Sequence, residues 1–127
     1  MFLTIKGTEY EFKATIGFLK DLNERIKVDV DGLKGVKKNI GYRFMLGLLH
    51  EGDAEALADI LMLANKHCNP SVSRKDIEEY IADDETDIDN LFEKVFDFLE
   101  NSNVTKKITR DWKKDVKEAE EKAKANN

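Results

Sequence analysis

The sequence predicts a mainly α fold: a helical domain with a short N-terminal β-hairpin and a charged C-terminal helix. Three observations predict it. Residues 2–12 alternate apolar and polar side chains around a Gly7-Thr8 pair, which is typical of a hairpin. Apolar residues then recur at helical spacing over most of the chain. Beyond residue 103, the chain is dominated by charge but keeps apolar residues at four-residue steps.

The composition fits one modest core with a strongly solvated surface. A chain of 127 residues suits a single domain, and its 41% of apolar residues is enough for one core. Charged residues make up 37%, well above the quarter that is usual. The single cysteine cannot form an internal disulfide, and no stretch reaches the roughly 20 apolar residues that span a bilayer. We therefore expect a reduced, cytoplasmic protein that does not enter membranes.

Charge is spread unevenly along the chain. Residues 1–70 are balanced, whereas residues 71–103 hold eleven acidic against three basic side chains, a net charge of −8. Residues 104–127 hold eight basic against five acidic side chains, a net charge of +3. This asymmetry predicts a helical body over residues 1–103 and a charged helical tail over residues 104–127. The overall charge of −5 argues against a nucleic-acid partner.

The N-terminal half predicts two helices after the hairpin. The first covers residues 16–26, and the next segment, residues 28–32, reads as extended chain or loop with a turn. Residues 36–49 form an apolar segment whose part from Ile40 to Leu49 looks helical. Gly41 and Gly47 weaken that helix by roughly 1 kcal/mol each relative to Ala, and they permit another backbone to pack closely. The residues predicted to face inward on the first helix are Ile16, Leu19, Leu22 and Ile26.

The C-terminal half has clearer helix signals. Asp53 and Ser73 are good N-caps, and Pro70 must end the helix that follows Asp53. The residues predicted to face inward on that helix are Leu57, Ile60, Leu61 and Ala64. The acids that precede Ile88 match the dipole of a helix N-terminus. The longest apolar stripe in the chain follows, with residues at i, i+3, i+4, i+7, i+8 and i+11. Its members are Ile88, Leu91, Phe92, Val95, Phe96 and Leu99.

Signals for catalysis, metal binding and cofactor binding are weak or missing. The chain has two histidines and one cysteine, and the adjacent pair His67-Cys68 lacks the spacing of a structural zinc site. No nucleophile elbow and no phosphate-binding loop ending in Lys-Ser or Lys-Thr occurs. The acids of residues 83–89 lack the glycine and the closing Glu of a calcium loop. We therefore predict no enzyme activity, no cofactor and no metal.

Residues 32–38 offer one candidate for RNA binding. Gly32-Leu33-Lys34-Gly35 matches a G-x-x-G loop, and Lys37 and Lys38 follow it. Such loops clamp phosphates in some RNA-binding domains. Four residues are a weak signal, however, and the segment that follows looks helical where such a domain needs a strand. A small RNA-binding regulator stays a minor alternative.

Apolar groups in the less firmly packed segments are the candidates for partner contact. Trp112 stands in the charged tail, where it is either an anchor to the core or a partner-binding hot spot, since Trp is enriched in both roles. Ile108 precedes it by one helical turn, and Phe44 and Leu48 share one side of the glycine-containing segment. We predict that Phe44, Leu48, Ile108 and Trp112 contact a partner.

The order of these features resembles the tail assembly chaperones of siphophages and prophages from Gram-positive bacteria. The similarity spans about residues 1–107 and consists of many weak matches. The opening Leu3-Thr4-Ile5-Lys6-Gly7-Thr8-Glu9-Tyr10-Glu11-Phe12 is similar to that of the family, as is Ile16-Gly17-Phe18-Leu19. Further matches are Gly52-Asp53, Ala56-Leu57-Ala58-Asp59-Ile60, Ile77-Glu78-Glu79-Tyr80-Ile81, Asp87-Ile88-Asp89-Asn90-Leu91-Phe92 and Asn103-Val104-Thr105-Lys106-Lys107.

The resemblance implies a helper in tail building that acts in the cytoplasm of the infected or lysogenic host. Such proteins bind the tape measure protein, keep its apolar helices soluble and help recruit tail tube subunits, and they are absent from the mature virion. Self-association is left open. The main alternative is a structural virion protein, either a head–tail connector or a minor tail component.

Overall fold

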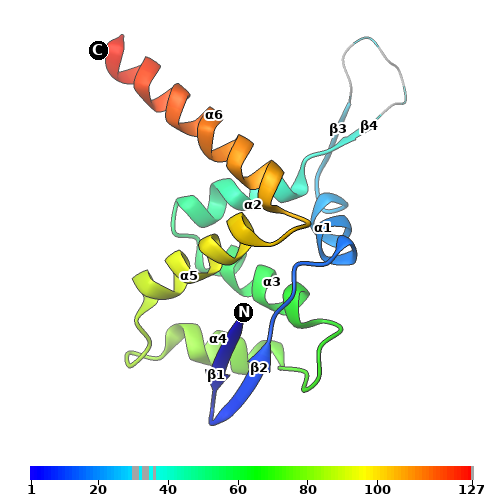
Figure 1. Ribbon diagram of the computed structural model, residues 1–127, viewed down its shortest axis with the longest axis vertical. Helices are drawn as coiled ribbons and strands as arrows, with labels where there is room; N and C mark the ends of the chain where they lie inside the picture. The colour runs from blue at the N-terminus through cyan, green and yellow to red at the C-terminus, as the bar shows by residue number, and fades with distance from the viewer. Residues whose placement is uncertain (30–31, 33–34, 36, 127) are drawn as a thin grey trace.

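A computed structural model describes residues 1–29, 32, 35 and 37–126 (Figure 1). These residues form six helices and two antiparallel hairpins, so the predicted mainly α fold is confirmed. The strands are β1 (Phe2–Ile5), β2 (Thr8–Glu11), β3 (Lys27–Asp29) and β4 (Lys37–Asn39). The helices are α1 (Ile16–Asn23), α2 (Gly41–His50), α3 (Ala54–Asn65), α4 (Arg74–Ala82), α5 (Ile88–Asn101) and α6 (Lys106–Ala125).

The predicted N-terminal hairpin is confirmed, and its apolar face lies on the core. β1 pairs with β2 in the register Leu3↔Tyr10 and Ile5↔Thr8. Leu3 and Ile5 are buried while Phe2 and Thr4 are exposed, as strand alternation requires. The turn uses positive φ angles at its two central residues, as type I′ hairpins do.

Polar contacts fasten the hairpin to helices from the second half of the chain. The Lys6 ammonium pairs with Asp76 at 2.9 Å and also with Glu79, both on α4. The Lys94 Nζ of α5 donates to the Phe2 carbonyl oxygen at 3.1 Å. The carboxylates raise the pKa of Lys6, and the Lys6 ammonium lowers the pKa of Asp76. These contacts join the first six residues to α4 and α5.

The first helix is shorter than predicted, and one of its predicted inward residues is wrong. Thr15 caps α1 by accepting a hydrogen bond from the Phe18 N–H, so Ile16 is the first helical residue. Ile16 is 74% exposed, whereas Phe18 and Leu22 are buried one turn apart. The i, i+4 pair Phe18 and Leu22 faces the core, which turns Ile16 toward solvent.

A second hairpin, β3–β4, was not predicted. β3 pairs with β4 in the register Lys27↔Asn39 and Asp29↔Lys37. The expected extended segment at residues 28–32 is therefore partly a strand, and residues 30 and 31 lie outside the described residues. α2 begins only at Gly41, because the residues before it pair as a strand. β4 follows the G-x-x-G loop, so the expectation that this loop lacks a following strand was wrong.

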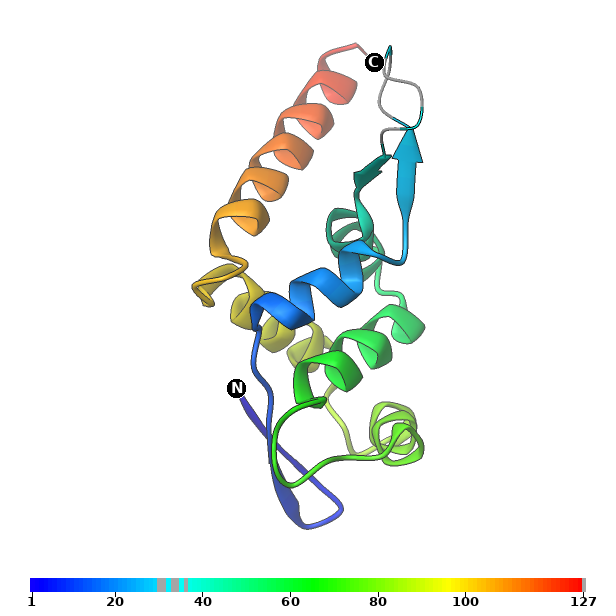
Figure 2. The same ribbon diagram turned by 90° about the vertical axis from the view of Figure 1, so that its right-hand side faces the viewer.

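The core is built around α3, whose predicted inward residues are all buried. α3 packs against α1, α2 and α4 (Figure 2). The predicted N-caps are confirmed: Asp53 accepts from the Ala56 N–H, and Ser73 from the Asp76 N–H. Of the long stripe on α5, Leu91, Val95 and Leu99 are buried. The buried α3 residues predicted from the sequence are Leu57, Ile60, Leu61 and Ala64.

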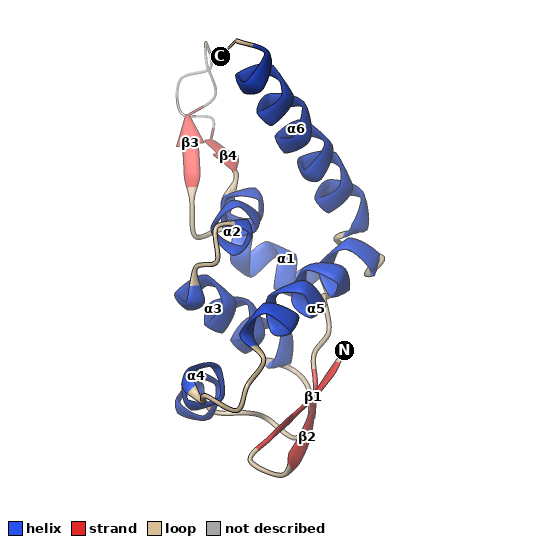
Figure 3. Ribbon diagram, turned by 90° about the vertical axis from the view of Figure 1, so that its left-hand side faces the viewer, coloured by secondary structure: helices blue, strands red, loops and turns tan. Residues whose placement is uncertain are grey.

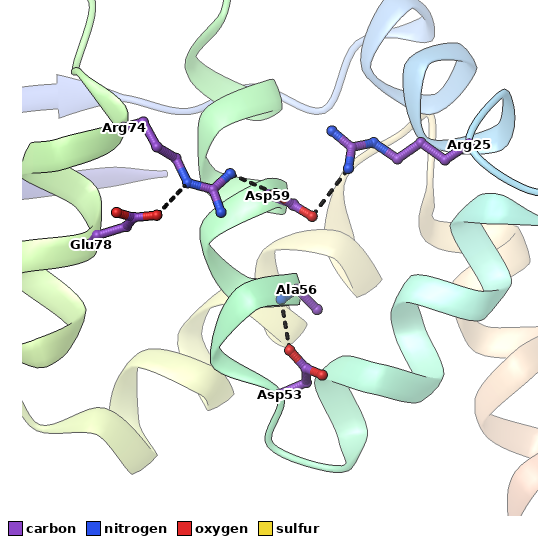
Figure 4. Close-up of polar contacts among 6 residues, drawn as sticks. All are labelled: Arg25, Asp53, Ala56, Asp59, Arg74 and Glu78. Carbon is purple, nitrogen blue, oxygen red and sulfur yellow. Dashed lines mark hydrogen bonds and ion pairs between the residues drawn. The ribbon is translucent and has the colours of Figure 1, made fainter.

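Asp59 links three helical segments at the side of the core (Figure 4). Its carboxylate accepts from Arg25, just beyond α1, at 3.1 Å and from Arg74 of α4 at 2.5 Å. Arg74 also donates to Glu78 at 3.0 Å. The Asp59 side chain is only 23% exposed, so this carboxylate is better shielded from water than an ordinary surface ion pair.

We expect Asp59→Asn to lower the free energy of unfolding by about 1–2 kcal/mol, because two guanidinium groups lose their shared carboxylate. Urea denaturation followed by circular dichroism measures the change. Asp111→Asn is the matched control: Asp111 is 58% exposed and pairs with Lys107 on its own helix. That control should change stability by less than about 0.5 kcal/mol. Equal effects for the two variants would contradict a structural role for the Asp59 network.

The last helix leaves the body after its first turns. Its N-terminal part packs on α2 and α5, and the remainder extends away from them (Figures 1 and 3). The β3–β4 hairpin extends from the same end of the molecule (Figure 3). No helix among the described residues is both long and apolar enough to cross a membrane.

Candidate partner-binding grooves beside α6

The N-terminal turns of α6 are held by a small buried polar cluster. The Tyr42 hydroxyl of α2 and the Thr109 hydroxyl of α6 lie 2.6 Å apart, and both side chains are buried. Thr105, also buried, donates its hydroxyl to the Leu99 carbonyl oxygen at 2.7 Å. Buried hydroxyl groups need partners. Tyr42 and Thr109 satisfy each other, and the Leu99 carbonyl oxygen satisfies Thr105. The cluster fixes where α6 leaves the body.

Burial raises the pKa of Tyr42 to about 12, although its hydrogen bond to Thr109 opposes the shift. The folded state thus disfavours the phenolate. Below pH of about 10, Tyr42 is neutral in both states and stability is unaffected. Above a pH of about 10, Tyr42 loses its proton more readily in the unfolded state than in the folded state. The free energy of unfolding therefore falls until the pH reaches about 12.

We expect the raised pKa of Tyr42 to lower the free energy of unfolding by about 1 kcal/mol at a pH of about 11. The measurement is urea denaturation of the wild type and of Tyr42→Phe, at about pH 8 and about pH 11. The lysines titrate alike in both proteins, so the difference between them reports Tyr42 alone. The wild type should lose more stability than the variant between the two pH values. An identical loss in both proteins would mean that Tyr42 ionises without a penalty in the folded state.

Trp112 lies directly beyond this cluster and joins the hydrophobic core. Its side chain is buried, with 8% of its surface exposed. Its ring centroid lies 5.6 Å from that of His50, edge to face, and 5.8 Å from that of Phe96. The structure thus favours the core-anchor alternative for Trp112. One edge of the residue nevertheless borders two surface grooves, one on each side of α6.

The first groove lies between the N-terminal end of α2 and the middle of α6, and we call it the α2/α6 groove. It has a volume of about 420 Å³. Phe44 forms one wall and is 48% exposed. Arg43 and Asp115 form an ion pair of 3.0 Å between the two helices. The lining residues are Ile40, Arg43, Phe44, Trp112, Asp115, Val116 and Ala119.

The structure brings together two of the four predicted contact residues. Phe44 and Trp112, from distant parts of the sequence, line the same groove. Leu48 and Ile108 lie one helical turn from Phe44 and Trp112, are half-buried against the core and do not line this groove. Their role as partner contacts stays a prediction, as it does for Phe44 and Trp112.

The sequence prediction missed most of the other lining residues. Val116 and Ala119 continue the face of Trp112 at i+4 and i+7, so extending the stripe past Val116 would have found Ala119. Ile40 lies one turn before Phe44, on the side that Phe44 shares with Leu48 in the sequence pattern. Arg43 gave no comparable signal, because only the crossing of α2 and α6 places it beside the tail.

Among the described residues, the other chemistry-bearing side chains form no recognisable site. Cys68 is buried. In the part of the chain that the structure describes, no group of three His, Cys, Asp or Glu side chains is arranged to hold a metal. For the RNA-binding alternative, Lys34 lies outside the described residues, whereas Gly32 and Gly35 have positive φ angles.

The structure is that of a small, mainly α protein with two surface grooves beside its last helix. A family model described as phage tail assembly chaperone protein, TAC, matches residues 2–114. The chain therefore belongs to the family of phage tail assembly chaperones, which confirms the resemblance seen in the sequence. Neither a curated protein nor a solved structure matches it. The matched range includes the packed turns of α6 and ends two residues after Trp112.

Proposed function

We propose that this chaperone binds the tape measure protein of its phage and helps recruit tail tube subunits during assembly. It acts in the cytoplasm of the infected or lysogenic host, has no catalytic role and does not remain in the mature virion. The α2/α6 groove is the proposed binding site. The observation that carries this proposal is the exposed Phe44 beside the apolar edge of Trp112.

The groove suits an apolar helix of a partner. Its walls are two helices, and its lining is apolar except for the Arg43–Asp115 pair. Amphipathic helices bind in such grooves through apolar residues spaced at one or two turns. A half-exposed aromatic side chain in a chain with 37% charged residues marks the place where such a contact is favourable.

We further propose that the chain works as two parts, the body of residues 1–103 and the tail of residues 104–127. Thr105, which directly precedes α6, and Thr109 and Trp112 within it are buried, whereas nearly every residue after Trp112 is exposed. The exposed charges would keep a bound apolar partner in solution. Leu48 and Ile108 would complete the contact surface if the partner helix extends past the groove.

The proposal is tested by co-expressing the tagged chain with the tape measure protein from its own locus. We expect both to co-purify in a complex of defined mass, measured by light scattering, with a tape measure protein that is insoluble alone. Phe44→Ser should weaken the association by about tenfold or more. Phe2→Ser is the matched control, since Phe2 is 51% exposed but lies on β1, away from the groove.

Two outcomes would contradict the proposal. One is a soluble tape measure protein that does not associate with the chain at low or moderate salt. The other is the presence of the chain in purified virions, which favours the structural-protein alternative. Equal losses of association in the Phe44→Ser and Phe2→Ser variants would place the binding site elsewhere.

A further inference from the structure

A second groove lies on the other side of α6, between α6 and α5, and we call it the α5/α6 groove. Its volume is about 600 Å³. Phe96, Trp112 and Val116 supply its apolar lining, and His50 of α2 borders it. Trp112 packs between the rings of Phe96 and His50, so the floor is held in place by core contacts. The α2/α6 groove shares Trp112 and Val116 with it but not Phe96 or His50.

The rim of this groove is basic in an otherwise acidic protein. Arg110, Lys113, Lys114 and Lys117 all border it, and their i, i+3, i+4, i+7 spacing places them on one side of α6. Lys113 pairs with Glu100 at 3.3 Å. The other three form no ion pair with any side chain in the described part of the chain. The preceding segment, residues 71–103, carries a net charge of −8.

We propose that the α5/α6 groove binds an amphipathic helix whose apolar stripe is bordered by carboxylates. The apolar stripe would cover Phe96, Trp112 and Val116, and the carboxylates would meet Arg110, Lys114 and Lys117. Charge complementarity of this kind selects the partner and accelerates its association. The inference goes beyond the proposed function, because such a helix can bind here whether or not the tape measure protein binds the α2/α6 groove.

The chemistry of the groove favours a protein helix over nucleic acid. Glu100 and Glu120 border the same groove, and the acidic body lies next to it. These acids disfavour a continuous phosphate backbone, whose binding depends on an extended basic surface, more than a helix that places a few carboxylates against Arg110, Lys114 and Lys117. The apolar lining makes no favourable contact with a phosphate backbone, whereas it matches the apolar face of an amphipathic helix.

The test uses the full chain and two synthetic helical peptides of about 20 residues. Both peptides carry the same leucine stripe and lack Trp, and they differ only in having Glu or Lys beside the stripe. Trp112 is the only tryptophan of the chain and lies in the groove, so its fluorescence reports binding. We expect the Glu peptide to bind about tenfold or more tightly than the Lys peptide, and more weakly as salt rises.

Charge reversals locate the contact. The double variant R110E/K117E should weaken binding of the Glu peptide by about tenfold or more. K107E/K124E changes the charge equally at two positions that do not line the groove, and it should have little effect. Phe44→Ser should also leave this binding unchanged, because Phe44 lines the α2/α6 groove and not the α5/α6 groove. That variant separates a failure of this inference from a failure of the proposed function.

Several results would overturn the inference. Equal affinity for the two peptides would show that the groove does not select its partner by charge. Equal losses of affinity for the Glu peptide in the two double variants would show that it is attracted by overall charge and not by the basic rim. Tighter binding of a single-stranded oligonucleotide than of the Glu peptide would assign the basic rim to nucleic acid. Dimerisation of the chain that the R110E/K117E variant abolishes would make a second copy the occupant.

Discussion

Gly41→Ala is expected to lower the free energy of unfolding by about 3 kcal/mol, and Gly47→Ala to raise it by about 1 kcal/mol. The two glycines lie on the same helix, α2. A Cβ at Gly41 would overlap the Leu22 carbonyl oxygen and lie 2.7 Å from the Leu22 carbonyl carbon. A Cβ at Gly47 meets no atom within 4 Å. At Gly41 the added methyl group therefore pushes α1 and α2 apart. At Gly47 it only raises the helix propensity of α2.

Urea denaturation followed by circular dichroism measures both changes. The obstacle at Gly41 is backbone, which cannot turn aside as a flexible side chain can. The same contact also brings the Asn23 side chain to the first turn of α2, where it accepts from the Tyr42 N–H at 3.1 Å. Wild-type stability in the Gly41→Ala protein would contradict the close approach of α1 and α2.

Trp112→Ala should lower the free energy of unfolding by about 3–4 kcal/mol, because it leaves a large cavity where α2, α5 and α6 meet. Circular dichroism is the appropriate probe, since the variant has no tryptophan left. Phe44→Ala is the matched control on the opposite wall of the α2/α6 groove. It removes a half-exposed ring and should cost about 1 kcal/mol or less.

The two results together separate the two roles predicted for Trp112. A core anchor gives a large loss of stability, whereas a pure binding residue gives a small one. A loss for Trp112→Ala no larger than that for Phe44→Ala would mean that α6 packs only weakly on the body. The tail would then be free to move as a unit, and the two grooves would not persist in solution.

Much of the fold could be predicted from the sequence because local signals agreed with the tertiary packing. The stripe from Ile88 to Leu99 has the period of a helix, and Asp53 and Ser73 cap the helices that they precede. The β3–β4 hairpin was missed because its strands have three residues each and are mostly charged. Ile16 was misplaced because the inner face of α1 follows Phe18 and Leu22, and the helical rotation places Ile16 on the opposite side.

The candidate site could be predicted only in part. Phe44 and Trp112 were found as apolar residues that lacked obvious partners, which is a property of the sequence. Their meeting in one groove depends on how α2 crosses α6, and the buried contact of Tyr42 with Thr109 fixes that crossing. No periodicity shows that two hydroxyl groups so far apart in the chain will meet. The role of Gly41 could be predicted in part. The sequence suggested that another backbone packs closely against it, but not that this backbone belongs to α1.

The attachment of the N-terminal hairpin has a consequence for the order in which the chain folds during synthesis. Lys6 is tied to Asp76 and Glu79, and Phe2 to Lys94. The ribosome releases β1 and β2 first, yet their partners emerge only when most of the chain has been made. A two-stranded hairpin is barely stable alone, so Leu3 and Ile5 remain uncovered until then. The earliest residues of this assembly factor are thus among the last to reach their final place, and a nascent chain stalled before α4 would expose their apolar face.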